Sequence, residues 1–304
     1  MITVSLIGGL GNQMFQYAAG KALAERHGVG LALDLSGFQN YALRSFLLDH
    51  LCVPEADAAS VRLTSAEKST NHFVRSLWKQ RIDRVLGRAG LPKLPASADH
   101  YREPHFHYDP VFEGLGPQTS LFGHFQSERY FTSIAGALRE WLLPRQPFGV
   151  TAAEVLGWIG RSPLPVSGHV RRGDYLKPGT AEFHGILGEP YYRRAINRIE
   201  TAIGEETEFF VFSDDPIAAE QVLNFVPKSR LNHVRGDPER PWEDMALMAR
   251  CRHHVIANSS FSWWGAWLNR SPAKVVVAPH AWFAPAELKK RNTADLYPPG
   301  WILV

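Results

Sequence analysis

The stretch SLIGGLGNQMFQYAAGKALAERHG, residues 5–28, joins a strand-like apolar run to a helical pattern of apolar residues through a glycine-rich turn. Three glycines fall within four positions, at Gly8, Gly9 and Gly11. Glycine weakens regular structure, so it is used where the backbone bends sharply or approaches another group closely. The stretch therefore predicts a strand, a ligand-binding loop and a helix over about residues 13–27.

The glycine-rich loop has two other interpretations. A dinucleotide-binding fingerprint would read G-x-G-x-x-G, with an acidic residue about 20 positions further on. The first two glycines and Asp34 fit this pattern, but Met14 stands in place of the third glycine. The other alternative is a tight strand-to-helix turn that binds no ligand. Asn12 and Gln13 favour binding, because two amides at a helix start suit sugar hydroxyls or phosphate oxygens.

The composition is that of a folded globular protein. Of the 304 residues, 45% are hydrophobic and 21% are charged. A net charge of +3 is too small to indicate a nucleic-acid surface. Cys52 and Cys251 lie far apart in the sequence, without the spacing of a metal site. We expect both cysteines to be reduced and buried, as inside a cell.

The location predicted from the sequence is the cytoplasm. The first residues, MITVSL, lack a basic region, and no segment offers the roughly 18 apolar residues that a membrane span needs. One segment leaves an alternative open. FVRSLWKQRIDRVLGRAGL, residues 73–91, has the pattern of a basic amphipathic helix. Such a helix either buries its apolar face on the protein or lies peripherally at the inner face of a membrane.

Strand and helix patterns alternate along the chain, which indicates βαβ units and parallel sheets. The strand candidates are TVSLI, GLALDL, LPVSGHV, EFFVFSDD, HHVIANSS and KVVVAP, and the helix candidates among the later ones are EPYYRRAINRIETAI, PIAAEQVLNF and PWEDMALMARC. Residues 142–167 carry four prolines and three glycines around one short helix candidate. We therefore expect an α/β protein with domains at 1–150 and 151–304.

HVRRGDY, residues 169–175, places two adjacent arginines at the end of a predicted strand. The two guanidinium groups cannot both point into an apolar core, and their geometry matches phosphate oxygens, so a diphosphate is the expected partner. Asp174 is expected to hold one of the arginines in position. The alternative is a structural salt bridge without a ligand.

FFVFSDDP ends another predicted strand with Ser213, Asp214 and Asp215. Adjacent carboxylates can hold a metal, but the spacing is not the D-x-D of metal-using nucleotide-sugar enzymes. A carboxylate here can instead accept hydrogen bonds from a guanine edge or a ribose. The alternative is a helix N-cap, because Pro216 follows and aspartate favours that position.

ANSSFSWWGAWL, residues 257–268, presents three serines at the start of a predicted helix. Backbone N–H groups at such a start, with hydroxyls beside them, form an anion site. We expect Trp263, Trp264 and Trp267 to pack the helix against the core rather than to bind sugar.

Together these motifs resemble, in order, the bacterial α-1,2-fucosyltransferases of glycosyltransferase family 11. The matching strings are GGLGNQMFQYA, LFGHFQSERYF, HVRRGDY, FHGILGEPYY, FFVFSDD, EDMALMARCRHHVIANSSFSWWGAWL and KVVVAPHAWF. They span nearly the whole chain. The departures are His124, where the family often has an aromatic residue, and the pair His253 and His254.

The resemblance implies a GT-B fold, in which two Rossmann-like domains face each other across a cleft. It implies a galactoside 2-α-L-fucosyltransferase: an inverting enzyme that takes L-fucose from GDP-L-fucose, without a metal or other cofactor. The implied acceptor is the 2-hydroxyl of a terminal β-galactoside, in an oligosaccharide or a lipopolysaccharide (O-antigen) precursor. The alternatives are another fucosyl linkage, or a non-catalytic protein that binds glycan or nucleotide on the same scaffold.

On the donor side, the resemblance implies that Arg171 and Arg172 hold the diphosphate with Asp174 as their partner. Asp215 would contact the nucleoside. The residues implied to line the phosphate end are the serines of the helix start, Ser259, Ser260 and Ser262.

On the acceptor side, the resemblance implies Asn12, which faces the cleft with the glycine loop, and Gln126. A base must take the proton from the acceptor hydroxyl in a single displacement. His184 in FHG is the candidate base, and the alternative is a structural histidine bonded to backbone. With Arg171 and Asp174 it completes the expected catalytic set.

Overall fold

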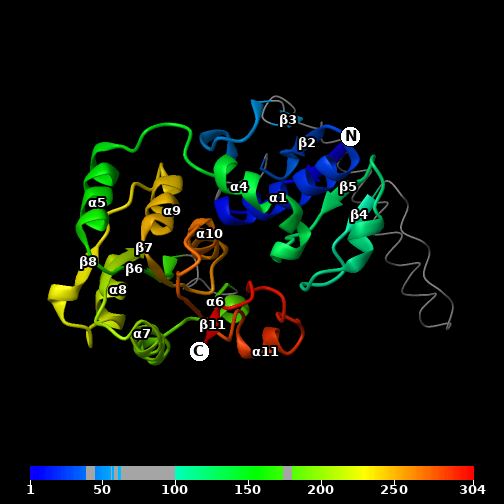
Figure 1. Cartoon of the computed structure of the whole chain (residues 1–304). Helices are drawn as coiled ribbons and strands as arrows, with labels where there is room; N and C mark the ends of the chain where they lie inside the picture. The colour runs from blue at the N-terminus through cyan, green and yellow to red at the C-terminus, as the bar shows by residue number, and fades with distance from the viewer. Residues whose placement is uncertain (39–44, 56, 58–60, 63–99, 174–179) are drawn as a thin grey trace.

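The computed structural model describes residues 1–38, 45–55, 57, 61–62, 100–173 and 180–304 (Figure 1). The basic segment 73–91 and Asp174 lie outside the described residues. The described part of the chain is a mixed α/β structure with two parallel sheets. The first sheet is built from the N-terminal part of the chain and the second from the C-terminal part.

The N-terminal sheet has five strands in the order β3-β2-β1-β5-β4, and every pair is parallel. The strands are β1 Ile2–Ser5, β2 Leu31–Asp34, β3 Val61–Arg62, β4 His100–Arg102 and β5 Ser120–Phe122. Strand β1 lies at the centre, where its pairing with β2 begins at Ile2 and Leu31. The carboxyl end of β1 leads directly into the glycine-rich loop.

Helix α1 (Leu10–His27) follows that loop and is buried over most of its circumference. It begins three residues earlier than predicted, because the carbonyl of Gly9 accepts from the N–H groups of Asn12 and Gln13. Gly28 ends the helix in the left-handed conformation, as is usual for a C-terminal glycine. A helix buried on nearly all sides must pack against more than one neighbour.

The C-terminal sheet has six parallel strands in the order β11-β10-β9-β6-β7-β8. The strands are β6 Pro165–Val170, β7 Glu208–Ser213, β8 Leu231–His233, β9 His253–Val255, β10 Val276–Ala278 and β11 Ile302–Leu303. All six residues of β6 are buried, as expected for a central strand with both faces covered.

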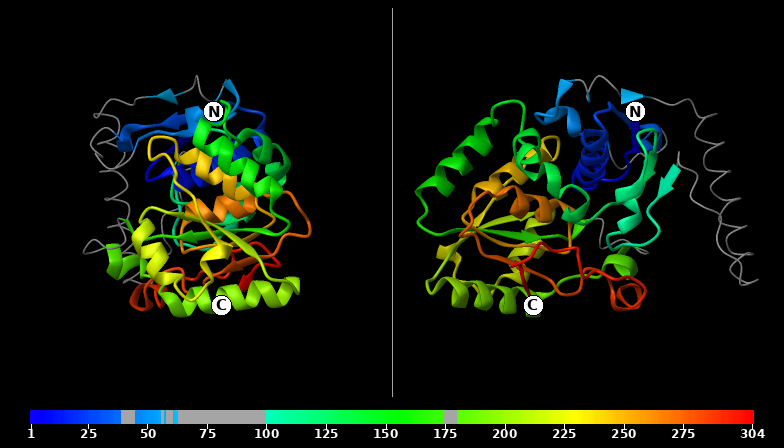
Figure 2. Two further views of the ribbon diagram at one scale, coloured as in Figure 1. Left: turned by 90° about the vertical axis from the view of Figure 1, so that its left-hand side faces the viewer. Right: turned by 45° about the vertical axis from the view of Figure 1, so that its right-hand side comes forward.

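Helices cover both faces of the C-terminal sheet, with α7 on one face and α5 and α9 on the other (Figure 2). The remaining α-helices are α4 Ala135–Trp141, α5 Val150–Arg161, α6 Thr180–His184, α7 Glu189–Ile203, α8 Pro216–Val222, α9 Pro241–Arg250, α10 Ser260–Leu268 and α11 Pro285–Leu288. Short 3-10 turns lie at Ser36–Phe38, Leu48–His50, Pro110–Gly114, Glu128–Tyr130, Thr132–Ile134 and Lys228–Arg230.

The two parts of the chain share one hydrophobic core, which forms where α1 packs against α10 (Figure 1). The ring of Phe15 on α1 lies 4.5 Å from the ring of Trp263 and 4.8 Å from that of Trp264. The indole N–H of Trp264 donates to the carbonyl of Gly11 at 2.9 Å. Trp267 is buried as well, which confirms that the tryptophans of this helix pack the core.

The cysteine prediction is half right. Cys251 is buried, and burial raises the pKa of its thiol. Cys52 is exposed, because it lies in a turn at the surface where its thiol contacts the carbonyl of Pro144. Among the described residues, no helix is long and apolar enough to cross a membrane.

Candidate active site

The carboxyl ends of β1 and β9 meet at the starts of the helices that follow them. A Cβ atom on Gly11 would lie 2.6 Å from the backbone carbon of Ser260, so α1 and α10 touch at their first turns. In open parallel sheets, ligands bind beyond the carboxyl ends of the strands. The meeting point of these two helices is therefore the natural candidate site.

The glycine loop is held from within by the buried side chain of Gln13. The amide N–H₂ of Gln13 donates to the carbonyls of Gly8 (3.0 Å) and Ser45 (2.9 Å), and its oxygen accepts from the N–H of Leu47. Gln13 is fully buried, so its amide supports the loop and does not face a ligand. Gln13 therefore does not favour ligand binding as expected, because its amide is used up inside the loop.

The glycines serve different purposes from the one expected. Gly8 has a φ of +81°, which few other residues adopt without strain. Gly11 lets the backbone approach α10 rather than a sugar, because the space its side chain would occupy is filled by Ser260. The loop borders the candidate site, but its close approach is to the other half of the molecule.

The arginine pair is organised by Asp214. One carboxylate oxygen of Asp214 pairs with the Arg171 guanidinium at 2.7 Å, and the other accepts from the backbone N–H of Arg172 at 2.8 Å. A Cβ on Gly173 would collide with this carboxylate, so a larger residue there would displace Asp214 from the arginines. The partner predicted from the sequence, Asp174, lies outside the described residues. For Asp214 the sequence suggested a metal ligand, a guanine or ribose acceptor, or a helix cap, but not a partner of the arginines.

The two arginines have different surroundings. The Arg171 side chain is 20% exposed and lies at the carboxyl end of β6. Arg172 is buried, and its guanidinium donates to the carbonyls of Arg171 (3.2 Å) and Leu187 (2.6 Å). As expected, the two arginines do not both point inward: Arg172 does, with backbone carbonyls rather than apolar groups around its charge, and Arg171 does not.

The serines at the start of α10 also differ in their exposure to solvent. Ser259 caps the helix by accepting from the N–H of Phe261, and the hydroxyl of Ser262 bonds with the N–H of Ala257. Both serines are buried, whereas Ser260 is partly exposed. With the start of α1 beside it, this end of α10 combines two helix N-termini, and each carries partial positive charge.

Asp215 acts as the N-cap of α8. Its Oδ1 accepts from the N–H of Ala218 at 3.0 Å, and Pro216 stands at the first helical position. The structural alternative raised from the sequence is therefore present. Asp215 is also partly exposed, at the carboxyl end of β7.

Asn12 and Gln126 meet on the N-terminal side of the candidate site. The amide N–H₂ of Gln126 donates to the side-chain oxygen of Asn12 at 2.9 Å. Gln126 is buried, and its own carbonyl oxygen has no partner among the described residues. The two residues expected on the acceptor side thus form one amide pair, with Asn12 the more exposed member.

Glu103 holds the turn that carries Gln126. Its Oε2 accepts from the backbone N–H groups of His124 (2.7 Å) and Phe125 (3.0 Å). Phe125 has a φ of 52°, an unusual conformation for a residue with a side chain. Burial raises the pKa of Glu103 to about 7, although the two N–H donors act in the opposite direction. Sequence reasoning missed this residue, and the available signal was an acid directly after a short strand.

His184 lies at the end of α6, beside aromatic side chains. Its ring lies 6.3 Å from the ring of Phe283. The buried amide of Asn258 donates to the carbonyl of His184 at 2.8 Å, which fastens this turn to the residue before Ser259. The expected base therefore lies next to the start of α10. Asn258, which makes this link, was also missed from the sequence.

His169 is a second histidine close to the arginine pair. It is buried at the end of β6, with its ring 5.9 Å from the ring of Phe261. Burial, helped by the charge of Arg171, lowers the pKa of His169 to about 3. The ring therefore stays neutral at physiological pH and packs beneath the site.

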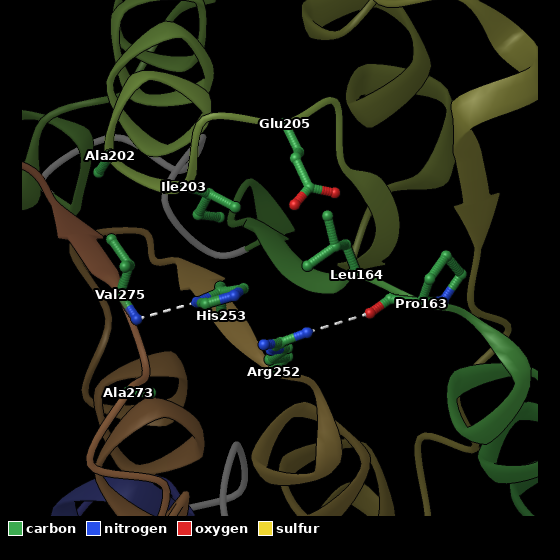
Figure 3. Close-up of a pocket in the computed structure, with 9 residues that line it drawn as sticks. All are labelled: Pro163, Leu164, Ala202, Ile203, Glu205, Arg252, His253, Ala273 and Val275. Carbon is green, nitrogen blue, oxygen red and sulfur yellow. Dashed lines mark hydrogen bonds between the residues drawn. The ribbon is translucent and has the colours of Figure 1, made fainter.

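A hollow of about 330 Å³ lies at the opposite edge of the C-terminal sheet (Figure 3). Its lining includes Leu164, Arg252, His253 and Val275, which stand at or before the amino ends of β6, β9 and β10. His253 Nδ1 accepts from the N–H of Val275 at 3.0 Å. This edge lies away from Arg171 and the helix starts, so we do not assign the hollow to the candidate site. Within the described ranges, no group of three or more His, Cys, Asp or Glu side chains could hold a metal.

Comparison with known proteins gives a consistent set of relatives. A family profile described as glycosyl transferase family 11 matches residues 98–304. An α-1,2-colitosyltransferase of Escherichia coli is 33% identical over all of this chain and 99% of that protein. The O-antigen biosynthesis glycosyltransferase WbnK, also of Escherichia coli, is 32% identical over 95% of this chain and 97% of that protein.

More distant relatives extend the match. Human galactoside α-(1,2)-fucosyltransferase 1 is 26% identical over 88% of this chain, which spans 65% of the human protein. Among solved structures, a mutant of Arabidopsis thaliana FUT1 in complex with GDP aligns with a TM-score of 0.53 and 12% identity. That alignment covers 90% of this chain and 69% of the plant chain, and it supports the fold.

Proposed function

Because the chain belongs to glycosyltransferase family 11, we propose that it transfers L-fucose from GDP-L-fucose to the 2-hydroxyl of a terminal β-galactoside in a glycan. The product linkage is α-1,2, formed by inversion at the anomeric carbon of fucose. The glycan class named for one bacterial relative, an O-antigen, supports an oligosaccharide or O-antigen precursor as acceptor. The two separate parallel sheets support the GT-B arrangement, with proposed domains at 1–150 and 151–304.

The observation that carries this proposal is the gathering of positive charge at the carboxyl ends of β1, β6 and β9. Arg171 is held in place by Asp214, and the starts of α1 and α10 touch beside it. As GDP departs, negative charge develops on the diphosphate. Fixed guanidinium and N–H groups stabilise that charge without having to reorganise. Arg171 is accordingly the group proposed to assist the leaving group, and Ser260 is the partly exposed serine at the phosphate end.

The other donor residues take supporting roles in this proposal. Arg172 fixes the loop that presents Arg171, and Ser259 and Ser262 shape the helix start. Asp215 keeps its second carboxylate oxygen for a ribose hydroxyl. Asp174 stays proposed as a further partner of the arginines.

On the acceptor side, the amide pair of Asn12 and Gln126 supports a role in binding sugar hydroxyls. His184 is proposed as the base that accepts the proton of the attacking 2-hydroxyl. His184 lies beside the start of α10, next to the proposed donor site. This position supports the role, because a base must come within hydrogen-bond reach of the hydroxyl proton that it accepts.

A second candidate donor is GDP-colitose. Colitose is L-fucose without its 3-hydroxyl group, and a relative that matches the whole chain is named as a colitosyltransferase. A site that makes no strong hydrogen bond to the 3-hydroxyl would accept both sugars.

A donor and acceptor screen tests the proposal. Purified protein is incubated with GDP-fucose, GDP-colitose, GDP-mannose or UDP-galactose and with lactose-like or N-acetyllactosamine-like acceptors. Released nucleotide is measured, and product linkage is determined by NMR. We expect fucosylation at the 2-hydroxyl of galactose. A faster rate with GDP-colitose would select the second candidate, and fucose on a 3-hydroxyl of glucose or N-acetylglucosamine would contradict the linkage. Binding without turnover in every mixture would identify a non-catalytic protein.

The same assay tests the role of a metal. We expect activity to survive dialysis against a strong chelator, since Arg171 and the helix starts supply positive charge at the diphosphate. Complete loss that manganese or magnesium restores would contradict this electrostatic account.

A further inference from the structure

Asp244 places a carboxylate at the edge of the C-terminal sheet near the candidate site. It lies in the first turn of α9, after the loop that follows β8. A Cβ on Gly236 would collide with the Asp244 carboxylate, so the carboxylate rests directly against the backbone of that loop. Gly236 is exposed and Asp244 is partly buried. The Asp244 carboxylate is therefore partly covered by protein and partly accessible, at the carboxyl edge of the sheet.

The Asp244 carboxylate lacks hydrogen-bond donors among the residues that the structure describes. No hydrogen bond or ion pair from the part of the chain that the structure describes reaches it, whereas neighbouring Glu243 accepts from the N–H of Gly149 and pairs with Arg240. Burial, with the charges of Glu243 and Asp237, raises the pKa of Asp244 to about 7. Keeping a partly buried carboxylate without donors costs free energy, so its presence calls for a partner that binds there.

The sheet places the loop against which Asp244 rests two strands away from Arg171. Strands β6, β7 and β8 are parallel neighbours, and Arg171 follows the first while Gly236 follows the third. Two strand spacings amount to about 10 Å. A nucleoside diphosphate whose phosphates lie at Arg171 can therefore extend along the carboxyl edge and bring its base to the loop after β8.

We propose that Asp244 is the residue that recognises guanine, its two oxygens accepting from N1–H and from the 2-amino group of the base. This inference rests on the proposed function, which supplies a guanosine donor. Asp215, the carboxylate singled out from the sequence, is less suited to this pairing, because its Oδ1 already accepts from Ala218. Adenine and uracil lack the pair of adjacent donors that Asp244 would accept, so they would leave one oxygen unpaired in the enclosed site.

The test is a nucleotide-binding panel measured by calorimetry with GDP, IDP, XDP and UDP. IDP lacks the 2-amino group, and XDP carries an oxygen in its place. We expect the wild type to bind GDP at least about tenfold more tightly than IDP and to bind XDP weakly. In Asp244→Asn, the affinity for GDP should fall about 100-fold. XDP should become the preferred ligand of that variant, because an asparagine amide donates to the new oxygen. This gain of binding cannot arise from misfolding.

Two further variants make the assignment specific. Asp237→Asn removes a charge from the same exposed loop and should keep the wild-type order of affinities. Asp215→Asn should keep it as well. The inference is overturned if Asp244→Asn still prefers GDP, or if Asp215→Asn is the variant that inverts the order. Should Asp244→Asn fail to melt cooperatively, Asp244→Ser replaces it and must lose the preference for GDP over IDP. If the wild type prefers UDP, the guanosine donor itself is rejected. If the wild type prefers GDP and Asp244→Asn keeps that preference, only this inference is rejected.

Discussion

Asp214 shows why the partner of a charged motif is hard to identify from neighbouring letters. The sequence alone offers Asp174, three residues beyond Arg171, as the nearest carboxylate. In the structure, β6 and β7 pair in parallel with Val170 opposite Ser213, so the next residues, Arg171 and Asp214, lie side by side. The motif predicted that a carboxylate holds an arginine here, but the strand register decides which carboxylate it is.

Arg171→Lys should impair catalysis although the charge is kept. A single ammonium group cannot contact Asp214 and a phosphate in the two-pronged manner of a guanidinium. We expect a loss of about 2 to 4 kcal/mol in transition-state stabilisation, by analogy with removal of one oxyanion-hole donor. The measurement is kcat/KM with saturating acceptor. Arg193→Lys, in an exposed pair with Glu189, is the control and should stay near wild type. Equal activity in the two variants would remove Arg171 from the site.

Glu103 should make stability depend on pH. Burial raises its folded pKa to about 7 from an ordinary value of 4.5, so the fold favours the protonated form. Its contribution is complete below about pH 4.5 and is lost as pH rises through about 7. Glu103→Gln keeps an acceptor oxygen for the N–H groups of His124 and Phe125 but cannot ionise. The variant should therefore lose less stability than the wild type between pH 5 and pH 8.

Urea denaturation at several pH values measures this difference. Glu154→Gln, on an exposed position of α5, is the matched control and should follow the wild type. Part of the pH dependence of the free energy of unfolding will remain in every variant, because Asp244 also has a raised pKa. Parallel curves for the wild type and Glu103→Gln would show that Glu103 does not titrate in this range.

At the scale of elements, the longer helices and the strands within clear apolar runs were predictable, whereas the short strands β3, β4, β5, β8 and β11 were not. The pattern EPYYRRAINRIETAI predicted a helix that the structure places at Glu189–Ile203. Strands β4, β5 and β8 have three residues each and β11 has two, too few for an alternating pattern to appear. Their positions depend on neighbouring strands, and the turn that carries Gln126 depends on β4 and β5.

Gly11→Ala should destabilise the protein, although alanine is normally the better helix residue. A Cβ at this position would lie 2.6 Å from the backbone of Ser260, and neither helix start can move without disturbing the shared core. We expect a loss of about 1 to 3 kcal/mol in the free energy of unfolding, as for other overpacked sites. Nucleotide affinity should fall as well, because the two helix starts would be pushed apart.

Gly160→Ala is the control for this prediction. Gly160 lies in α5, and a Cβ there would meet nothing within 4 Å. We expect this variant to gain about 0.4 to 1 kcal/mol, because alanine restricts the unfolded chain. Urea denaturation gives both values. A Gly11→Ala variant as stable as Gly160→Ala would show that the helix starts adjust freely.

At the scale of the whole molecule, the sequence predicted two domains, and the structure adds a core that joins the two parts. Side chains from α1, including Phe15, lie in the same hydrophobic cluster as Trp263, Trp264 and Trp282. Composition marked residues 142–167 as a boundary, but it could not reveal this contact. Residues separated by about 250 positions meet there, and no local pattern records such a pairing. Large apolar contacts between parts of a chain also limit their relative motion.

The shared core predicts that both sheets unfold together. Phe15 belongs to α1, yet its ring packs on Trp263 and Trp264 of α10, so losing it should weaken both halves. We expect Phe15→Ala to lower the free energy of unfolding by about 3 to 5 kcal/mol. Native-state hydrogen exchange measures the effect separately at the amides of β1 and β6. Both strands should lose protection by the same amount, because one cooperative opening exposes them. Val155→Ala is the control, because Val155 lies on α5 in a smaller hydrophobic cluster. It should lower the protection of both strands equally, but by less than Phe15→Ala does. If Phe15→Ala lowers protection in β1 alone, the two parts unfold independently and the contact between α1 and α10 is only an interface.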